Sequence, residues 1–437
     1  MLQPAKILIL TYGSRGDVEP FIALACGLTA RGHTVTLSSA EKYGDWVKSF
    51  GLAFEPLSND TIDLMTTPDG IAALEGSSGL IKRVAAGTRL AKKSGRLNDG
   101  LNRDAWRAAQ AVQPDLIIFH PKVMAAPHIA EALDIPAVMG LLQPMIVPTN
   151  EFPVAGMPRL PIPGYNKLGY ALVKLSYSAF RKSVNQLRTK ALKLTAIQHR
   201  NEVLFPRGAL PIKTLHAISS WVVPRPKDWP DAAVMSGYWS LKSDGDYEPP
   251  ASLRSFLERG PPPVYIGFGS MTVEDPKALQ EVLVEALRKA NVRGVLSTGW
   301  AGFDAIESDD ILSVSDVPHE WLFPKMAAVV HHGGMGTTAQ GFRAGVPCVL
   351  CPFFGDQPYW AQKSVALGVG APPVPRKALT ADKLAHSIHL AVNDASLKKN
   401  ASDLALHLQS EDGVGTAIAE IEACLAKVAE SFMKTSV

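Results

Sequence analysis

Two adjacent histidines followed by glycines and threonines make residues 327–342, AAVVHHGGMGTTAQGF, the part of the sequence most suited to chemistry. The apolar run before His331 is typical of a buried strand, and the glycines after His332 are typical of a turn into a helix. The first N–H groups of a helix are unpaired and lie at the positive end of its dipole, and glycine lets a phosphate approach the backbone closely. Thr337 adds a hydroxyl donor, and an imidazole can donate a hydrogen bond to a departing charge. The pattern therefore predicts a site for a diphosphate.

A metal site or another nucleotide motif explains these residues less well. Neighbouring strand residues point to opposite faces, and no Cys, Asp or further His lies nearby at ligand spacing, so we expect no metal. HEWLF has Phe323 where the zinc motif HExxH requires its second histidine. The sequence has no Gly-Lys-Ser/Thr phosphate loop, and YGSRGD, residues 12–17, is not the GxGxxG of a nicotinamide site. A metalloprotein, a phosphate-loop NTPase and a dehydrogenase are therefore disfavoured.

A second candidate for chemistry is Asp17, in GSRGDVEP near the start of the chain. A hydroxyl is a weak nucleophile until its proton is removed, and a carboxylate at hydrogen-bond distance can act as that general base. The alternative is that Asp17 caps a helix that Pro20 opens, because Asp is a favoured capping residue. Both interpretations remain open. Arg15, two residues earlier, could steady a carboxylate or a phosphate.

Length and composition indicate two domains and no nucleic-acid partner. The chain has 437 residues, of which 46% are hydrophobic and 19% charged, and this is more than one ordinary core accommodates. The net charge of +3 gives no argument for nucleic-acid binding. The apolar run at the N-terminus is too short for a signal peptide, and we expect a cytoplasmic protein in which Cys348 and Cys351 are reduced core thiols.

Short β-rich runs alternate with helical patterns in both halves of the chain, which predicts an α/β fold with two doubly wound, Rossmann-like parallel sheets. We expect strands at KILIL, TVTLSS, DLIIF and PAVMG in a first domain, residues 1–240. A polar segment with a Pro pair follows, and the expected strands of the second domain, residues 241–437, are PVYIGFGS, RGVLSTGW, AAVVHH and VPCVLCPFF. We expect the last helices to pack back on the first domain. Ligands of such sheets bind at the carboxyl ends of the strands, so the two domains should face each other across a cleft.

Several motifs, in order along nearly the whole chain, resemble the UDP-dependent glycosyltransferases of the GT-B fold. They are TYGSRGDVEPFIALACGLTARGHTVTL, GFGSM, LSTGW, DVPHEWLF, HHGGMGTTAQGFRAGVP and PFFGDQPYW. The resemblance is greatest to the sterol 3β-glucosyltransferase branch, shared with bacterial enzymes that glycosylate lipids, macrolides and glycopeptides. It implies inverting transfer of a sugar from a UDP-sugar co-substrate to an acceptor hydroxyl, with no metal and no other cofactor. We also expect the extra N-terminal membrane domains of the fungal sterol enzymes to be missing.

The resemblance also implies roles for individual residues. Asp17 is the expected base, and either His331 or His332 contacts the diphosphate, with His331 matching the family's phosphate-binding histidine in register. The residues expected to bind the donor are Ser14, Arg15, Gly16, Ser270, Trp300, Val317, His319, Gly334, Met335, Gly336, Thr337, Asp356 and Gln357. Among these, Val317 and His319 hold the uracil through their backbone and Met335 contributes only its N–H.

Simpler roles remain open for several donor-site candidates. Ser270 could be an ordinary serine at the end of a strand, and Trp300 could pack in the core rather than line the uracil pocket. Asp356 and Gln357, expected to hold the sugar hydroxyls, could cap the helix that follows them.

A basic segment, residues 167–200, is the main clue to the acceptor. It contains eight Lys or Arg and no Asp or Glu, interleaved with apolar residues at helical spacing, and residues 81–103 form a second basic stretch. Basic amphipathic helices lie on anionic bilayers, although a solvated helix face would have a similar pattern. We therefore expect a lipophilic, sterol-like acceptor, with peripheral contact with an anionic membrane as an open alternative.

The predicted function is that of a hexosyltransferase of lipid metabolism that transfers glucose to a lipophilic alcohol. Two alternatives remain: a non-catalytic relative that binds a ligand or partner, and a sugar-nucleotide epimerase, which would turn over without an acceptor.

Overall fold

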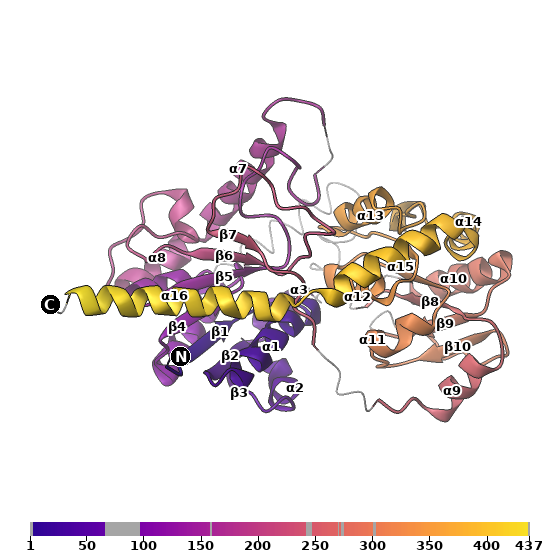
Figure 1. Ribbon diagram of the computed structural model, residues 1–437, viewed down its shortest axis with the longest axis horizontal. Coiled ribbons are helices and arrows are strands. Elements are labelled where there is room, and N and C mark those ends of the chain that lie inside the picture. Colours follow the sequence, from indigo (N-terminus) through magenta and orange to yellow (C-terminus); the bar gives the residue numbers. More distant parts are fainter. Residues whose placement is uncertain are drawn as a thin grey trace. The chain divides into compact units, whose positions relative to one another are not determined.

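The computed structural model describes residues 3–65, 97–157, 160–241, 247–269, 271, 275–299 and 303–435. These residues form two compact units (Figure 1). The first unit contains the described residues up to 241 together with 412–435, and the second contains those from 247 to 411. The division falls beside the boundary expected at residue 240.

A seven-stranded parallel sheet forms the centre of the first unit, in the order β3-β2-β1-β4-β5-β6-β7. The strands are β1 (Lys6–Leu10), β2 (Thr34–Ala40), β3 (Ala53–Leu57), β4 (Leu116–Phe119), β5 (Ala137–Leu141), β6 (Lys213–His216) and β7 (Ala233–Met235). The four strands expected from sequence are confirmed as β1, β2, β4 and β5. The additional strands were missed because AFEPL contains a proline, and KTLH and AVM are very short.

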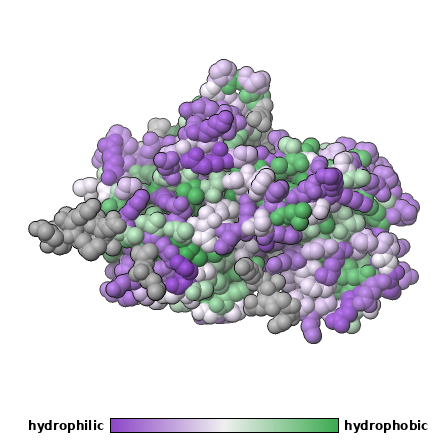
Figure 2. Space-filling model, viewed as in Figure 1, coloured by the Kyte–Doolittle hydropathy of each residue, from purple (hydrophilic) through white to green (hydrophobic). Residues whose placement is uncertain are grey.

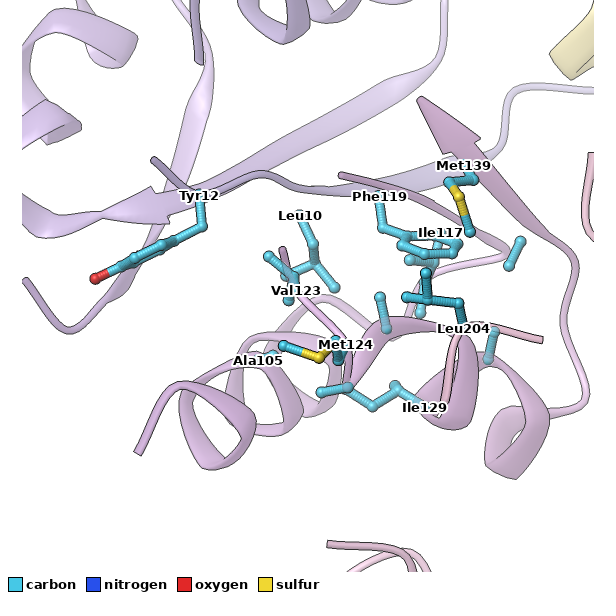
Figure 3. Packing of buried hydrophobic residues seen from close by; sticks show 14 of the residues in the cluster. Leu10, Tyr12, Ala105, Ile117, Phe119, Val123, Met124, Ile129, Met139 and Leu204 are labelled. Carbon is cyan, nitrogen blue, oxygen red and sulfur yellow. The ribbon is translucent and has the colours of Figure 1, made fainter. Parts of the chain in front are cut away.

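Helices and short 3-10 turns flank this sheet in the first unit. They are α1 (Arg15–Ala30), η1 (Glu41–Tyr43), α2 (Gly44–Lys48), α3 (Asp60–Met65), a helix over 97–112, α6 (Ala126–Leu133), α7 (Tyr165–Tyr177), η2 (Ser178–Phe180), α8 (Arg181–Lys190), η3 (Arg200–Val203) and α16 (Gly413–Thr435). Figure 3 shows Leu10, Ile117 and Phe119 of the sheet packed against Met124 and Ile129. Met124 lies just before α6, and Ile129 lies within it. This apolar contact fixes the carboxyl ends of β1 and β4. The candidate base, Asp17, follows β1, and residues that contact Asp17 follow β4.

The last helix, α16, belongs to the first unit although it follows the second unit in the chain. It packs on α1, where a Cβ at Gly27 would lie 2.5 Å from Val414 and 2.9 Å from Ile418. Arg31 pairs with Glu422, with Nη2 3.0 Å from Oε2. Glycine at position 27 therefore lets the two helices approach closely.

A five-stranded parallel sheet forms the centre of the second unit, in the order β10-β9-β8-β11-β12. The strands are β8 (Val264–Gly267), β9 (Gly294–Ser297), β10 (Ile311–Val314), β11 (Ala328–His331) and β12 (Cys348–Leu350). The helices are α9 (Ala251–Glu258), α10 (Pro276–Ala290), α11 (His319–Leu322), η4 (Phe323–Lys325), α12 (Met335–Ala344), α13 (Gln357–Ala366), η5 (Arg376–Ala378), α14 (Ala381–Asn393) and α15 (Ala395–Ser410). The four expected strands are confirmed, β10 is additional, and the two parallel sheets confirm the predicted fold class.

The strand order reverses once in each sheet, and each reversal defines a crevice. In the first unit β1 lies between β2 and β4, and in the second unit β8 lies between β9 and β11. Open α/β sheets bind ligands outside the carboxyl ends of the strands at such a switch point. The loops after β1 and β4, and those after β8 and β11, are therefore where site residues are expected.

Candidate active site

Asp17 lies at the switch point of the first unit and takes part in the start of α1. Its Oδ2 atom accepts hydrogen bonds from the Ser14 backbone N–H, at 2.7 Å, and from the Ser14 hydroxyl, at 3.0 Å. Ser14 is the N-cap and Asp17 the third residue of α1, so the pair forms a capping box. The expected capping role therefore exists, but the helix begins at Arg15 and Pro20 lies inside it, not at its opening.

The other carboxylate oxygen of Asp17 faces two residues that follow β4. Oδ1 lies 2.8 Å from Nζ of Lys122 and 3.8 Å from Nε2 of His120. Burial raises the pKa of Asp17, but the charge of Lys122 and the hydrogen bonds from Lys122 and Ser14 lower it by more, so the pKa lies below its ordinary value. Because the cap uses Oδ2 and the base chemistry would use Oδ1, the two roles of Asp17 are compatible.

His120 is a buried neighbour of Asp17 with a defined tautomer. Its Nδ1 atom accepts the Lys122 backbone N–H at 3.2 Å, which places the proton of the neutral ring on Nε2. Burial and the charge of Lys122 lower the pKa of His120 to about 3, so the ring is neutral at pH 7. His120 therefore presents a hydrogen-bond donor towards Asp17.

Sequence reasoning missed both His120 and Lys122. They follow the strand DLIIF in FHPK, and strand order alone brings them to Asp17. Titratable residues directly after a predicted strand were the signal that could have found them.

The residues before Asp17 contact groups of their own unit. Arg15 pairs with Glu19, with Nε 3.1 Å from Oε2, and its guanidinium lies 4.8 Å from the ring centre of Trp46. Gly16 is the second residue of α1. Donor binding by Ser14, Arg15 and Gly16 stays a prediction.

The histidine pair lies at the switch point of the second unit. His331 ends β11, and its Nδ1 accepts the Gly333 N–H at 3.1 Å, which leaves the ring proton on Nε2. Nε2 of His331 and Nδ1 of His332 are buried and have no hydrogen-bond partner among the described residues. Burial and the neighbouring His332 and His319 lower the pKa of His331 well below its usual value, and burial lowers that of His332 to about 4. Both rings are therefore neutral at pH 7, and His331 is a buried donor that needs an acceptor.

The Gly-rich turn leads into α12 as expected, with Gly334 as N-cap and Met335 as the first helical residue. No side chain caps this helix, and the N–H groups of its first turn have no partner within the helix. A Cβ at Gly336 would meet nothing within 4 Å, so space lies beside these N–H groups, which include that of Thr337. The side chain of Met335 is buried, which leaves its N–H as the group it offers. The helix start has the donors and the room that an anion requires.

The remaining donor candidates differ in how far the structure describes them. Ser270 and Trp300 lie outside the described residues. Val317 immediately precedes the turn into α11, and His319 is the first residue of that helix. The imidazole of His319 stacks on Phe323, at 4.3 Å between ring centres, and its Nε2 lies 3.2 Å from the hydroxyl of Tyr265. The side chain of His319 is thus part of a packed cluster, so a uracil contact there would use the backbone.

Asp356 and Gln357 shape the turn before α13. The amide oxygen of Gln357 accepts the N–H groups of Phe353, at 2.7 Å, and Phe354, at 3.2 Å, and the side chain is buried. Asp356 occupies the N-cap position, but its Oδ2 accepts the indole N–H of Trp360 at 2.7 Å and makes no cap hydrogen bond. The alternative of a helix cap is thus correct for the position of Asp356, but not for its side chain. Their contact with a sugar stays a prediction.

The cysteine prediction is confirmed: Cys348 and Cys351 are free and buried, and burial raises the pKa of each thiol to about 12. In the described part of the chain, no group of three or more His, Cys, Asp or Glu side chains is placed to hold a metal ion.

Two family models match the chain, one in each half. A glycosyltransferase family 28 N-terminal domain matches residues 7–146, and a C-terminal domain like that of erythromycin biosynthesis protein CIII matches residues 304–422. Among solved structures, the calicheamicin glycosyltransferase CalG4 has a TM-score of 0.71 at 18% identity, covering 98% of this chain and all of that one. The glycotransferase of kitacinnamycin has a TM-score of 0.69 at 20% identity, covering 97% and 100%. These likenesses define the fold as GT-B, as the resemblance implied.

Sequence relatives show which family of GT-B glycosyltransferases contains this chain. Sterol 3-beta-glucosyltransferase UGT80A2 of Arabidopsis thaliana is 35% identical over 95% of this chain and 65% of its own length, and UGT80B1 is 34% identical over 94% and 67%. The enzyme of Emericella nidulans is 36% identical over 96% of this chain and 30% of its own length. The chain belongs to the glycosyltransferase family that contains the sterol 3-beta-glucosyltransferases. It spans about two thirds of these plant relatives and under a third of the fungal one.

Proposed function

We propose that the protein transfers a sugar, glucose in the first instance, from a UDP-sugar to the hydroxyl of a sterol-like or other lipophilic acceptor. The observation that carries this proposal is Oδ1 of Asp17, a charged oxygen at a switch point that the helix cap leaves unused. Asp17 takes the acceptor proton as the acceptor oxygen attacks the anomeric carbon, and UDP leaves with the electrons of the broken C–O bond. Attack from the face opposite UDP inverts the anomeric centre. The names of the sequence relatives support the acceptor class.

The donor diphosphate occupies the start of α12 in this proposal. The unpaired N–H groups there and the Nε2–H of His331 stabilise the charge that develops on UDP, without a metal. A related structure, the glycosyltransferase VinC, was solved with dTDP, which supports a nucleotide diphosphate as ligand; that protein is 19% identical to this chain. Transfer that continues in the presence of a chelator is expected, and a strict requirement for Mg²⁺ or Mn²⁺ would contradict this part of the proposal.

The acceptor is proposed to reach the protein at an anionic membrane surface through α7. Leu168, Leu172 and Leu175 of this helix are exposed, and they recur at the spacing of one helix face. Lys167 is exposed on the same helix, and Figure 2 displays hydrophilic residues over this part of the surface. One member of the basic segment, Arg188, is excluded, because it is buried in an ion pair with Glu131. Among the described helices, none is both long and apolar enough to cross a bilayer.

The test is to incubate the protein with UDP- and dTDP-sugars and a panel of sterols and other lipophilic alcohols, and to measure product masses. A glucosylated sterol formed from UDP-glucose supports the proposal. Conversion of the sugar nucleotide without any acceptor would indicate the epimerase alternative. Binding of UDP-sugar without either reaction, across the panel, would indicate a non-catalytic relative.

A further inference from the structure

We propose that Lys122 is a positioning residue for Asp17, holding Oδ1 as the charged, oriented atom that takes the acceptor proton. This inference rests on the proposed function and assigns a part of its machinery that neither the motifs nor the relatives identify. Its basis is that the two oxygens of the Asp17 carboxylate have different partners. Ser14 donates to Oδ2 within the helix cap, and Lys122, in the loop after β4, donates to Oδ1.

The loop that carries Lys122 is fixed to the end of β1. Leu10 and Phe119 are register partners in neighbouring strands, and the His120 N–H donates to the Leu10 carbonyl at 2.9 Å. Lys122 follows two residues later and reaches Asp17 across 105 positions of sequence. The sheet thus presents the ammonium to the carboxylate, and only the side chain of Lys122 has to be ordered.

The solvent exposure of the ion pair between Lys122 and Asp17 argues that its role is functional. The side chain of Lys122 is 51% exposed and that of Asp17 is 17% exposed. A half-exposed ion pair contributes little to folding stability, and the cap of α1 does not need it. Its main effect is on the carboxylate, because a nearby positive charge favours the ionised form.

The other described titratable groups near Asp17 do not supply the positive charge beside Oδ1. His120 is neutral and donates from Nε2, so it neither takes the acceptor proton nor supplies a fixed charge. Tyr43, from η1, donates its hydroxyl to the Gly13 carbonyl and has its pKa raised to about 12, chiefly by burial, so it is also neutral. Arg15, on α1 itself, pairs with Glu19. Among the residues that the structure describes, Lys122 is therefore the cation in contact with Oδ1.

The role implies a sequence of proton movements. The acceptor hydroxyl approaches Oδ1 beside the ammonium, gives its proton to Oδ1 as the new glycosidic bond forms, and UDP departs with the electrons of the old bond. The protonated carboxyl then releases the proton to water, and the adjacent ammonium favours this release because it stabilises the carboxylate.

The test compares Lys122→Met, Lys122→Arg and a control, Lys48→Met, at an exposed lysine of the same unit. Transfer rates are measured as kcat/KM for the acceptor from pH 8 down to the lowest pH at which the chain stays folded, because the pKa of Asp17 lies below its ordinary value. Loss of the neighbouring charge should move the acid limb of the profile to higher pH in Lys122→Met. Lys122→Arg should restore the wild-type limb, and Lys48→Met should not move it.

A second measurement does not depend on turnover. In the full chain with ¹³C-labelled aspartate, the carboxyl signal of Asp17, assigned by its loss in Asp17→Asn, should titrate at higher pH in Lys122→Met than in the wild type. An unchanged titration, or a changed titration with an unchanged acid limb, would overturn the positioning role. If the wild type transfers no sugar, the proposed function fails, and the carboxyl titration still decides whether Lys122 controls the charge of Asp17.

Discussion

His332 lies between two glycine turns of the second unit. A Cβ added at Gly269, after β8, would lie 3.1 Å from Cε1 of His332, and one at Gly334 would lie 2.4 Å from Nε2. The imidazole therefore spaces the two loops that meet at the switch point, and it can do so only because both neighbours lack a side chain. The start of α12 is held in place by this contact.

Replacing Gly269 by Ala should weaken UDP binding. The new Cβ pushes on His332 and displaces the start of α12, and the positive φ of +59° adds strain of about 1 kcal/mol. Gly51→Ala is the matched control, since its φ is +72° but its Cβ would meet nothing within 4 Å. Calorimetry should show weaker UDP binding for Gly269→Ala alone, with both variants losing similar stability. Equal UDP affinities in the two variants would show that His332 does not space the two loops.

The two histidines should differ in their effect on the donor. His331→Ala removes a buried donor that has no acceptor in the described chain, and the loss of a hydrogen bond to a charged phosphate should weaken UDP binding about 10- to 100-fold. His332→Ala should weaken it less, because that ring packs between two turns. The measurement is UDP affinity without added metal. Equal, mild effects would mean that both residues only pack, and a larger effect at His332 would exchange their roles.

Asp17→Asn should separate chemistry from donor binding. The amide keeps an oxygen for the Ser14 cap but lacks the basic Oδ1, so transfer should fall about 10²- to 10⁴-fold while UDP affinity stays unchanged. Asp394→Asn is the matched control, because Asp394 caps α15 through the N–H groups of Ser396 and Leu397. The control should transfer at the wild-type rate. If Asp17→Asn lost activity only in proportion to its melting temperature, Asp17 would be a cap alone.

Stability should fall as the pH drops from about 6.5 towards 4. Burial lowers the pKa of His120 and His128 to about 3 and that of His216 to about 4, each from an ordinary value of 6.5. Between the folded and unfolded pKa values the unfolded chain binds more protons, so stability is fully present above about pH 6.5 and is lost as these histidines are forced to protonate. Melting temperatures at pH 7 and pH 5 test this. His128→Gln should show a smaller drop than the wild type, and a flat profile in the wild type would contradict the burial of neutral imidazoles.

Contact with anionic membranes should depend on the exposed face of α7. The wild type should cosediment with vesicles that contain phosphatidylserine at low salt and dissociate as salt rises, because surface attraction is screened over about 10 Å at 0.1 M. Leu172→Ser should reduce binding, since it removes an apolar side chain from that face. Leu406→Ser is the control, because Leu406 is equally apolar and 67% exposed but lies on α15. Equal binding of both variants, or binding to neutral vesicles alone, would mean that the basic segment is an ordinary solvated helix face.

The predictable part of the fold was the part with strong local patterns. Apolar runs such as KILIL and AAVVHH located strands, and the Gly-rich turn located the start of α12, because each is determined by neighbouring residues. Strands such as KTLH are stabilised by the sheet around them, so their sequences carry little signal of their own.

The contacts within the site were less predictable, for the same reason. Lys122 meets Asp17 only because β4 pairs with β1, and no local pattern encodes that pairing. Gln357 is predicted to bind a sugar, and the sequence did not show that its amide oxygen also closes the turn before α13. Arg188 was counted with a membrane-facing set, although Glu131, 57 positions away, holds it inside the first unit. Long-range partners decided the cases of Lys122 and Arg188, whereas the partners of Gln357 lie three and four residues away.

The placement of α16 has a practical consequence for exchanging parts between relatives. Because this helix fills the surface of α1 at Gly27 and pairs with Arg31, a single crossover near residue 241 would combine one protein's α1 with another's last helix. Such a chimaera would bring unmatched side chains together at a contact too close for a Cβ. A graft with two junctions, one near 241 and one near 411, would transplant the second unit as an insert and leave the native helix pair intact.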